Sequence, residues 1–172
     1  IINQNHYRRL TGLLDVARER GQILFGGEID DMHLRIAPTL INVENQNDPL
    51  LAEELFGPLL PVKSTSNLDS AINEINQAPR PLAIYLFGGN STEQQKLLNQ
   101  TSSGGVCFND VILQAGIPDM PFGGIGPSGM GRYHGRAGFQ TFSHQKSILR
   151  RSFSIDLKFR YPPYSTDIKW MK

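Results

Sequence analysis

The chain has 172 residues, with 17 Lys or Arg and 16 Asp or Glu, so its formal net charge at pH 7 is +1. This balance argues against nucleic acid and anionic membranes as partners, because both are bound largely through net positive charge.

The single cysteine excludes an internal disulfide and fits a reducing compartment, so we expect a cytoplasmic protein. The sequence contains no run of 18 or more apolar residues, so no membrane-spanning helix is predicted. A membrane anchor beyond Lys172 is left as an open alternative. Because the first residue is Ile1 rather than methionine, we interpret the chain as a piece of a longer protein.

The first part of the chain predicts one helix and three strands. Apolar residues at helical spacing over 3–20 indicate an amphipathic helix, and Gly21 is its stop. Apolar runs at 22–25 and 59–62 predict strands. Residues 35–43 are rich in β-formers but contain a proline, which favours a strand at the edge of a sheet.

A very short helix is predicted within residues 48–58. Asp48 is a good N-cap, and Pro49 suits the first helical position because no amide hydrogen is needed there. Gly57 can take the left-handed conformation that ends a helix, and Pro58 cannot continue it. From composition alone, this segment is a capped surface helix whose apolar residues lie in the core.

Two more helices and two more strands follow in alternation. The sequence predicts helices at 67–79 and 91–100, each beginning at its own N-cap residue. The apolar run at 82–87 is typical of a strand covered on both faces, and 105–108 predicts another short strand. Strands alternating with helices indicate a parallel sheet flanked by helices, and therefore an α/β fold.

The chain changes character at residue 109, where glycine and proline replace periodic apolar residues. A long irregular segment in a compact domain is usually functional or disordered, and its prolines and Phe122 favour an ordered one. Residues 131–142 are expected to be partly helical, and 146–153 to form a final strand.

Residues 124–129 match the Gly-x-Gly-x-x-Gly string of dinucleotide-binding loops. Such a loop needs a strand before it, a helix opening at it, and an acidic residue about 20 positions later. Here Pro121 precedes the string, Pro127 removes an amide that could bind phosphate, and residues 149–151 are Leu-Arg-Arg. We therefore reject a phosphate-binding loop, and with it a simple nucleotide-binding domain.

Two segments of the chain match known family signatures. The first is Glu-Leu-Phe-Gly-Pro at 54–58, and the second is Pro-Phe-Gly-Gly at 121–124 followed by Ser-Gly-Met-Gly at 128–131. Both resemble signatures of the aldehyde dehydrogenase superfamily. With Tyr-His-Gly at 133–135 and Arg-Tyr-Pro-Pro at 160–163, they resemble most the class 3 branch, which acts on fatty and aromatic aldehydes. The resemblance covers essentially the whole chain, but it corresponds to only about the last third of such an enzyme.

The resemblance implies roles for several side chains. Glu54 would accept hydrogen bonds from the vicinal hydroxyls of the nicotinamide ribose, and Phe56 would pack near the nicotinamide of NAD or NADP. Phe122 would be a wall of the aldehyde channel, and Asn109 would face the site from a strand end. His134 would approach the channel, with an ordinary hydrogen-bonded loop histidine as the equal alternative. The residues expected to shape the pocket further are Ile112, Ala115 and Gly116.

In this family a cysteine thiolate attacks the aldehyde carbonyl. That cysteine stands in a Gly-Gln-x-Cys context upstream of the first signature, whereas Cys107 follows Gly-Gly-Val on an apolar strand. We interpret Cys107 as a small buried hydrophobic residue. No catalytic residue is then expected in the chain, because the nucleophilic cysteine and the general-base glutamate lie outside it. The four histidines show no metal-site spacing, so no metal is predicted.

The sequence thus predicts part of an aldehyde dehydrogenase catalytic domain in residues 1–142 and an oligomerisation strand with its tail in 143–172. The same resemblance implies that the tail joins the sheet of a second copy and so forms a homodimer. The complete enzyme would oxidise aldehydes to carboxylic acids through a cysteine thiohemiacetal, whereas the chain alone would be inactive. The alternative is a non-catalytic assembly or dimerisation module derived from the same fold.

Overall fold

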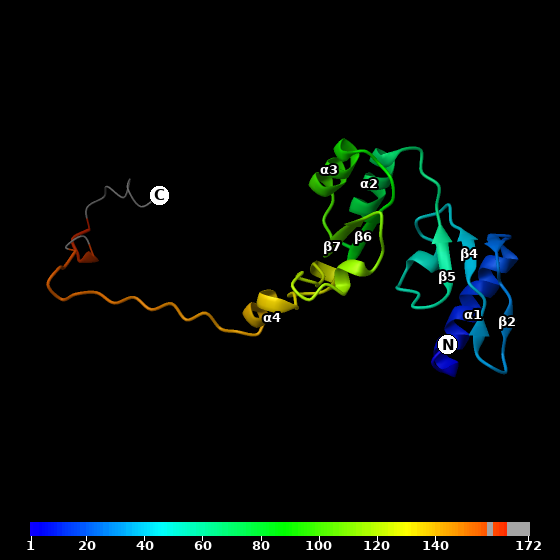
Figure 1. Cartoon of the computed structure of the whole chain (residues 1–172), viewed down its shortest axis with the longest axis horizontal. Coiled ribbons are helices and arrows are strands. Elements are labelled where there is room, and N and C mark those ends of the chain that lie inside the picture. The colour runs from blue at the N-terminus through cyan, green and yellow to red at the C-terminus, as the bar shows by residue number, and fades with distance from the viewer. Residues whose placement is uncertain (158–159, 165–172) are drawn as a thin grey trace.

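The computed structural model describes residues 1–157 and 160–164, which form two α/β lobes followed by an irregular segment (Figure 1). The elements of the first lobe are α1 (Gln4–Glu19), β1 (Ile23–Phe25), β2 (Ile29–Asp30), β3 (Arg35–Ile36), β4 (Thr39–Asn42), the 3-10 helix η1 (Pro49–Leu51) and β5 (Leu59–Val62). Those of the second lobe are α2 (Leu68–Gln77), β6 (Ala83–Leu86), α3 (Ser91–Gln100) and β7 (Gly105–Phe108). The irregular segment holds η2 (Leu113–Ala115), η3 (Gly126–Ser128) and α4 (Gly135–Thr141).

Helix α1 confirms the predicted amphipathic helix. The Asn3 side chain caps its start by accepting from the amide of His6 at 2.9 Å. Its buried face is Tyr7, Leu10, Leu14 and Ala17, which recur every three or four residues. Gly21, at φ +66°, follows its end, since a left-handed residue is tolerated best at glycine.

Helix α1 packs on a three-stranded sheet in the order β1-β4-β5. Strand β1 is antiparallel to β4, and β5 is parallel to it, with Ile41 opposite Pro61. The edge position expected for residues 35–43 is therefore wrong. Pro38 separates β3 from β4 instead of lying in a ladder, so it costs β4 no hydrogen bond and leaves that strand central.

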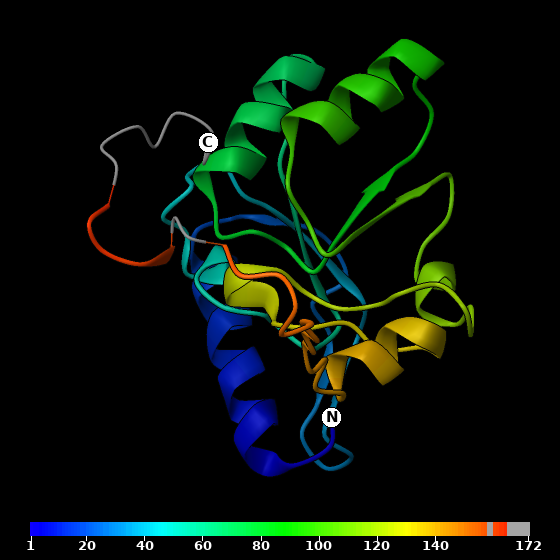
Figure 2. The ribbon, with the colours of Figure 1, turned by 90° about the vertical axis from the view of Figure 1, so that its left-hand side faces the viewer.

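The second lobe has its own small core. Strands β6 and β7 are parallel, with Ile84 opposite Val106, and α2 and α3 lie side by side next to them (Figures 1 and 2). Ile72, Ile84 and Leu97 join α2, β6 and α3 in one buried cluster. Strand β6 was expected to be covered on both faces, but Tyr85 is 39% exposed, because the helices cover one face only.

Two further expectations need correction in this lobe. The cap of α3 is Asn90 rather than Ser91: its side chain accepts from the amide of Glu93, whose carboxylate accepts in return from the amide of Asn90, at 3.0 and 2.8 Å. The α/β class is confirmed, yet the strands do not form one parallel sheet. Among the described residues β5 pairs only with β4, and β6 only with β7.

The segment after α4 does not form the strand expected at 146–153. Residues 143–152 belong to no helix or strand and continue from α4 as an extended ribbon (Figure 1). A strand is defined by hydrogen bonds to a neighbour, and the described part of the chain offers this segment none. The predicted tail also includes 158–159 and 165–172, which lie outside the described residues.

Candidate functional site

The segment 48–58 begins as the sequence predicts. The Asp48 carboxylate accepts from the amide of Leu50 at 3.0 Å and from the side-chain amide of Gln22 at 3.0 Å. The helix that follows is a single 3-10 turn, η1, rather than an α-helix, and Leu50 is its buried residue. Asp48 therefore anchors the start of the segment to the first lobe.

The contribution of Asp48 to the stability of the fold depends on pH. Desolvation by burial raises the pKa of Asp48, but the hydrogen bonds from Gln22 and Leu50 and the charge of Arg20 outweigh it and hold the pKa below its usual range. Its carboxylate therefore stabilises the fold fully above the unfolded pKa of about 4, and this contribution is lost as pH falls through the lower folded pKa.

We therefore expect Asp48→Asn to lower the melting temperature at neutral pH, and the gap to wild type to close on acidification below about pH 4. Thermal unfolding of both proteins across the acid range measures the gap. A gap that stays constant with pH would show that the charge of Asp48 contributes nothing.

The turn after η1 presents the two predicted coenzyme residues to solvent. Phe56 is 83% exposed, against the expectation from composition that it lies in the core, whereas Leu55 is half-buried against the first core. Glu54 is exposed. Glu53 is also exposed, and it accepts a hydrogen bond from Arg9 of α1 at 2.9 Å.

The expected left-handed glycine at the end of this turn is wrong by one residue. Phe56 takes the positive φ, +48°, and Gly57 does not. Glycine is required at 57 for space, because a Cβ there would lie 2.5 Å from Cδ1 of the fully buried Leu10. The turn thus lies directly against α1.

Backbone strain coincides with the predicted site. In residues 1–157 and 160–164, the non-glycine residues with positive φ are Leu34, Phe56, Asn109, Ile112 and His134. The last four are all residues that the sequence assigned to coenzyme or substrate. Such conformations cost about 1–3 kcal/mol each and cluster at functional sites. The strain is most unusual at the β-branched Ile112.

Asn109 fixes the carboxyl ends of the second lobe's strands. Its amide donates to the carbonyl of Leu86 at 2.8 Å, and its Oδ1 accepts from the amide of Gly88 at 2.7 Å. Asparagine tolerates the left-handed region better than other residues, which accounts for its φ of +59°. Ligands of open α/β sheets bind at this edge, outside the carboxyl ends of the strands.

An apolar hollow of about 460 Å³ follows Asn109 in the chain. Its walls include Ile112, Ala115 and Gly116, so the structure brings these three predicted residues together; the others are Val111, Leu113 and Ile117. Gln114 points away and is only 7% exposed, and its Nε2 donates to the Tyr85 hydroxyl at 3.0 Å. This pair was not predicted from the sequence, although a lone amide within an apolar loop could have indicated a buried hydrogen-bonding side chain.

Phe122 and His134 meet in an aromatic cluster with Tyr133. Phe122 and Tyr133 exchange two backbone hydrogen bonds, at 3.1 and 2.9 Å, and their rings meet edge to face at 5.8 Å. The His134 ring stacks on Phe122 at 6.4 Å. Its Nδ1 lies 3.1 Å from the Met120 carbonyl, which can only accept, so Nδ1 donates a proton to that carbonyl.

The glycine-rich string 124–129 is a closed turn. Ser128 Oγ accepts from the amide of Ile125 at 3.0 Å and donates to the Ile125 carbonyl at 3.1 Å. A Cβ on Gly124 would collide with the Ser128 carbonyl. The Ser128 hydroxyl and the Ile125 backbone therefore satisfy each other within the turn. The helix that begins within residues 124–129 is the single 3-10 turn η3.

The predicted site residues thus lie on two scaffolds. Asn109, Ile112, Phe122 and His134 belong to the second lobe and the segment after it, and the Glu54–Phe56 turn belongs to the first (Figure 1). Among the described residues, no hydrogen bond, ion pair or ring contact joins that turn to the second lobe.

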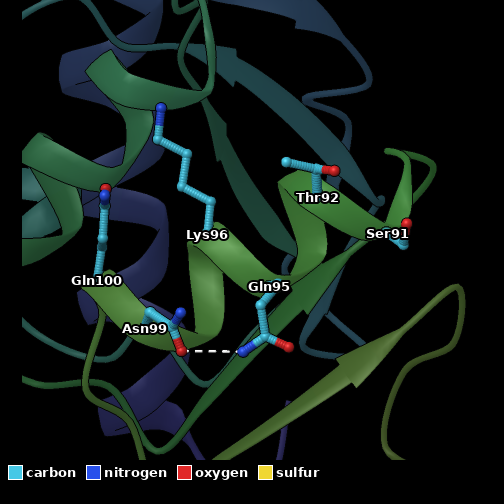
Figure 3. Close-up of a pocket in the computed structure, with 6 residues that line it drawn as sticks. All are labelled: Ser91, Thr92, Gln95, Lys96, Asn99 and Gln100. Atoms are coloured by element: carbon cyan, nitrogen blue, oxygen red, sulfur yellow. Dashed lines mark hydrogen bonds between the residues drawn. The ribbon is translucent and has the colours of Figure 1, made fainter.

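Other features carry none of the predicted site residues. A hollow of about 540 Å³, lined by residues with polar side chains, lies along α3 (Figure 3). There Gln95 donates to Asn99 at 2.9 Å, and Lys96 pairs with Asp69 of α2. Cys107 is half-buried on β7 opposite Tyr85, less buried than expected. In the described part of the chain, no group of three His, Cys, Asp or Glu could hold a metal ion, and no helix is long and apolar enough to cross a membrane.

Comparison with known proteins identifies the family. Residues 1–148 match the model of the aldehyde dehydrogenase family. The chain is 44% identical to aldehyde dehydrogenase family 3 member A2 of Mus musculus, over all of the chain and 35% of that protein. A solved structure titled as the substrate-bound state of Staphylococcus aureus AldH is 41% identical, with a TM-score of 0.80 over 99% of the chain and 37% of that structure. Betaine aldehyde dehydrogenase from Staphylococcus aureus, solved with NAD+, is 29% identical, with a TM-score of 0.71 over 81% of the chain and 29% of that structure.

The chain therefore belongs to the aldehyde dehydrogenase family. The resemblance to the class 3 branch is confirmed by the relatives named as family 3 members. The chain spans about a third of the length of the curated relatives that it matches.

Proposed function

We propose that residues 1–172 form the C-terminal part of an NAD(P)-dependent aldehyde dehydrogenase. Residues 1–142 would complete the catalytic domain, and 143–172 would form its oligomerisation strand and tail. An upstream cysteine would attack the aldehyde to give a thiohemiacetal, which loses hydride, and hydrolysis of the thioester would release the carboxylic acid. Bound NAD or NADP supplies the hydride acceptor. Family membership and the complex of a relative with NAD+ support this proposal.

The exposed turn that carries Glu54 and Phe56 is the observation on which the proposal rests. A carboxylate offers two acceptor oxygens, which match the two adjacent hydroxyls of a ribose. The Phe56 ring is 83% exposed on a strained turn, so its flat apolar face is free to pack against a ligand. The residues present therefore fit the nicotinamide half of the coenzyme.

The substrate side is assigned to the second scaffold. Phe122 and His134 would form one wall of the aldehyde channel, and Asn109 would face it from the strand ends. Ile112, Ala115 and Gly116 would widen it into the apolar hollow. Apolar walls favour a fatty or aromatic aldehyde over a charged one.

The tail is assigned to assembly. Residues 143–152 are extended and carry the exposed apolar side chains of Ile148 and Leu149. Such a segment can add as a strand to the sheet of a second copy, which supports a homodimer. The cytoplasmic location also stays a prediction.

The full-length product of the reading frame that encodes residues 1–172 provides the test. We expect its intact mass to be well above the 19.2 kDa of this chain, and its mixture with NAD+ or NADP+ to form reduced coenzyme only when an aldehyde is added. Alkylation of its thiols should abolish this activity. A mass of 19.2 kDa with no aldehyde-dependent reduction would contradict the proposal and favour the non-catalytic assembly module.

A further inference from the structure

Arg9 of α1 holds the chain on both sides of Glu54. Its NH1 donates to Oε1 of Glu53 at 2.9 Å, and its NH2 donates to the carbonyl of Leu55 at 2.5 Å. Glu53 and Leu55 are the residues directly before and after Glu54. One guanidinium group therefore fixes the backbone from which the Glu54 carboxylate projects.

The turn has few other restraints at this point. Helix η1 ends at Leu51, and residues 53–56 make no regular secondary structure before the strained Phe56. Leu55 packs on the core of the first lobe, and Gly57 lies against Leu10 of α1. These two contacts hold the core-facing side of the turn. Arg9 supplies the hydrogen bonds that set its orientation on the solvent side.

Stability alone does not account for this arrangement. The Arg9 and Glu53 side chains are 28% and 61% exposed, and exposed ion pairs contribute only about 0–1 kcal/mol to stability. Arginine is suited to the geometry, because its planar fork directs two donors at once to a carboxylate and to a carbonyl. Lysine, with a single nitrogen, holds such a pair less rigidly.

We propose that Arg9 is a positioning residue for the coenzyme, acting through Glu54 and Phe56. This inference rests on the proposed function, since it assumes that these two side chains meet the nicotinamide half. Small displacements of catalytic geometry reduce rates strongly. Loss of Arg9 should therefore impair hydride transfer more than it impairs folding.

The test compares Arg9→Met with Arg8→Met in the full-length enzyme. Arg8 is the exposed neighbour on the same helix, so its variant removes a charge without releasing the turn. We expect Arg9→Met to slow single-turnover hydride transfer and to weaken coenzyme binding, each on the order of 10-fold, with the KM for aldehyde little changed. Arg8→Met should behave as wild type, and Arg9→Lys should recover part of the loss.

Two outcomes would overturn the inference. One is a lower melting temperature for Arg9→Met with an unchanged hydride-transfer rate, which would make Arg9 purely structural. The other is an equal loss in Arg8→Met, which would make the effect one of general charge. Two further results separate failure of the proposed function from failure of this inference. If wild-type full-length protein forms no reduced coenzyme when aldehyde is added, the proposed function fails. If the wild type is active and Glu54→Gln slows hydride transfer but Arg9→Met does not, the role of Arg9 alone is wrong.

Discussion

Replacing Glu54 by Gln in the full-length enzyme should slow hydride transfer and weaken coenzyme binding. The amide keeps one acceptor oxygen but loses the negative charge and the second acceptor for the ribose hydroxyls. Hydrogen bonds to charged groups contribute about 1.5–3 kcal/mol, which corresponds to roughly a 10- to 100-fold change in rate. Single-turnover kinetics at saturating coenzyme measure this step directly, and the primary isotope effect from a deuterated aldehyde should increase.

Glu19→Gln is the matched control, because Glu19 is an exposed carboxylate at the end of α1. It should leave both rate and binding unchanged. If Glu54→Gln retained the wild-type single-turnover rate, Glu54 would have no part in positioning the coenzyme.

Replacing Gly124 by Ala should disrupt the aldehyde side of the site. The added methyl would overlap the backbone of Ser128, which cannot move away as a flexible side chain could. Overpacking of this kind typically costs about 1–3 kcal/mol and displaces backbone. We therefore expect a lower melting temperature and a large increase in the KM for aldehyde, since the turn lies directly after Phe122.

Gly138→Ala controls for the loss of a glycine in the same region. Its Cβ would meet atoms of Tyr133 at no less than 3.6 Å, an ordinary contact, and the residue lies within α4. Thermal unfolding and steady-state kinetics of the two variants should differ sharply. Equal behaviour would mean that the turn at Gly124 is not closely packed in the full-length enzyme.

Local features of the fold were predictable from the sequence. The caps of Asp48 and Asn67 act as expected, because each depends on a side chain and amides within three residues of it. The central position of β4 was not predictable, because a proline in the run favoured an edge and only the tertiary pairing shows that Pro38 precedes the ladder. Gly57 was expected to take the left-handed conformation, which Phe56 takes instead, and the close approach of Gly57 to Leu10 was not predictable because it involves another element.

The same division applies to the site. Sequence motifs predicted Glu54, Phe56 and Phe122 as site residues, because their family resemblance lies in contiguous residues. They did not identify Arg9, which is 44 positions from its partner Glu53. Nor did they identify Gln114, whose partner Tyr85 is 29 positions away. Residues that position a site through long-range contacts leave no local pattern, and a structure is needed to find them.

The most direct measurement is a crystal structure of the full-length enzyme with NAD+ bound. We predict that the Glu54 carboxylate lies within hydrogen-bond distance of both hydroxyls of the nicotinamide ribose. The nicotinamide should lie beside Phe56, and Arg9 should still bind Glu53 and Leu55. A complex in which other residues hold that ribose, with Glu54 facing bulk solvent, would contradict the central claim.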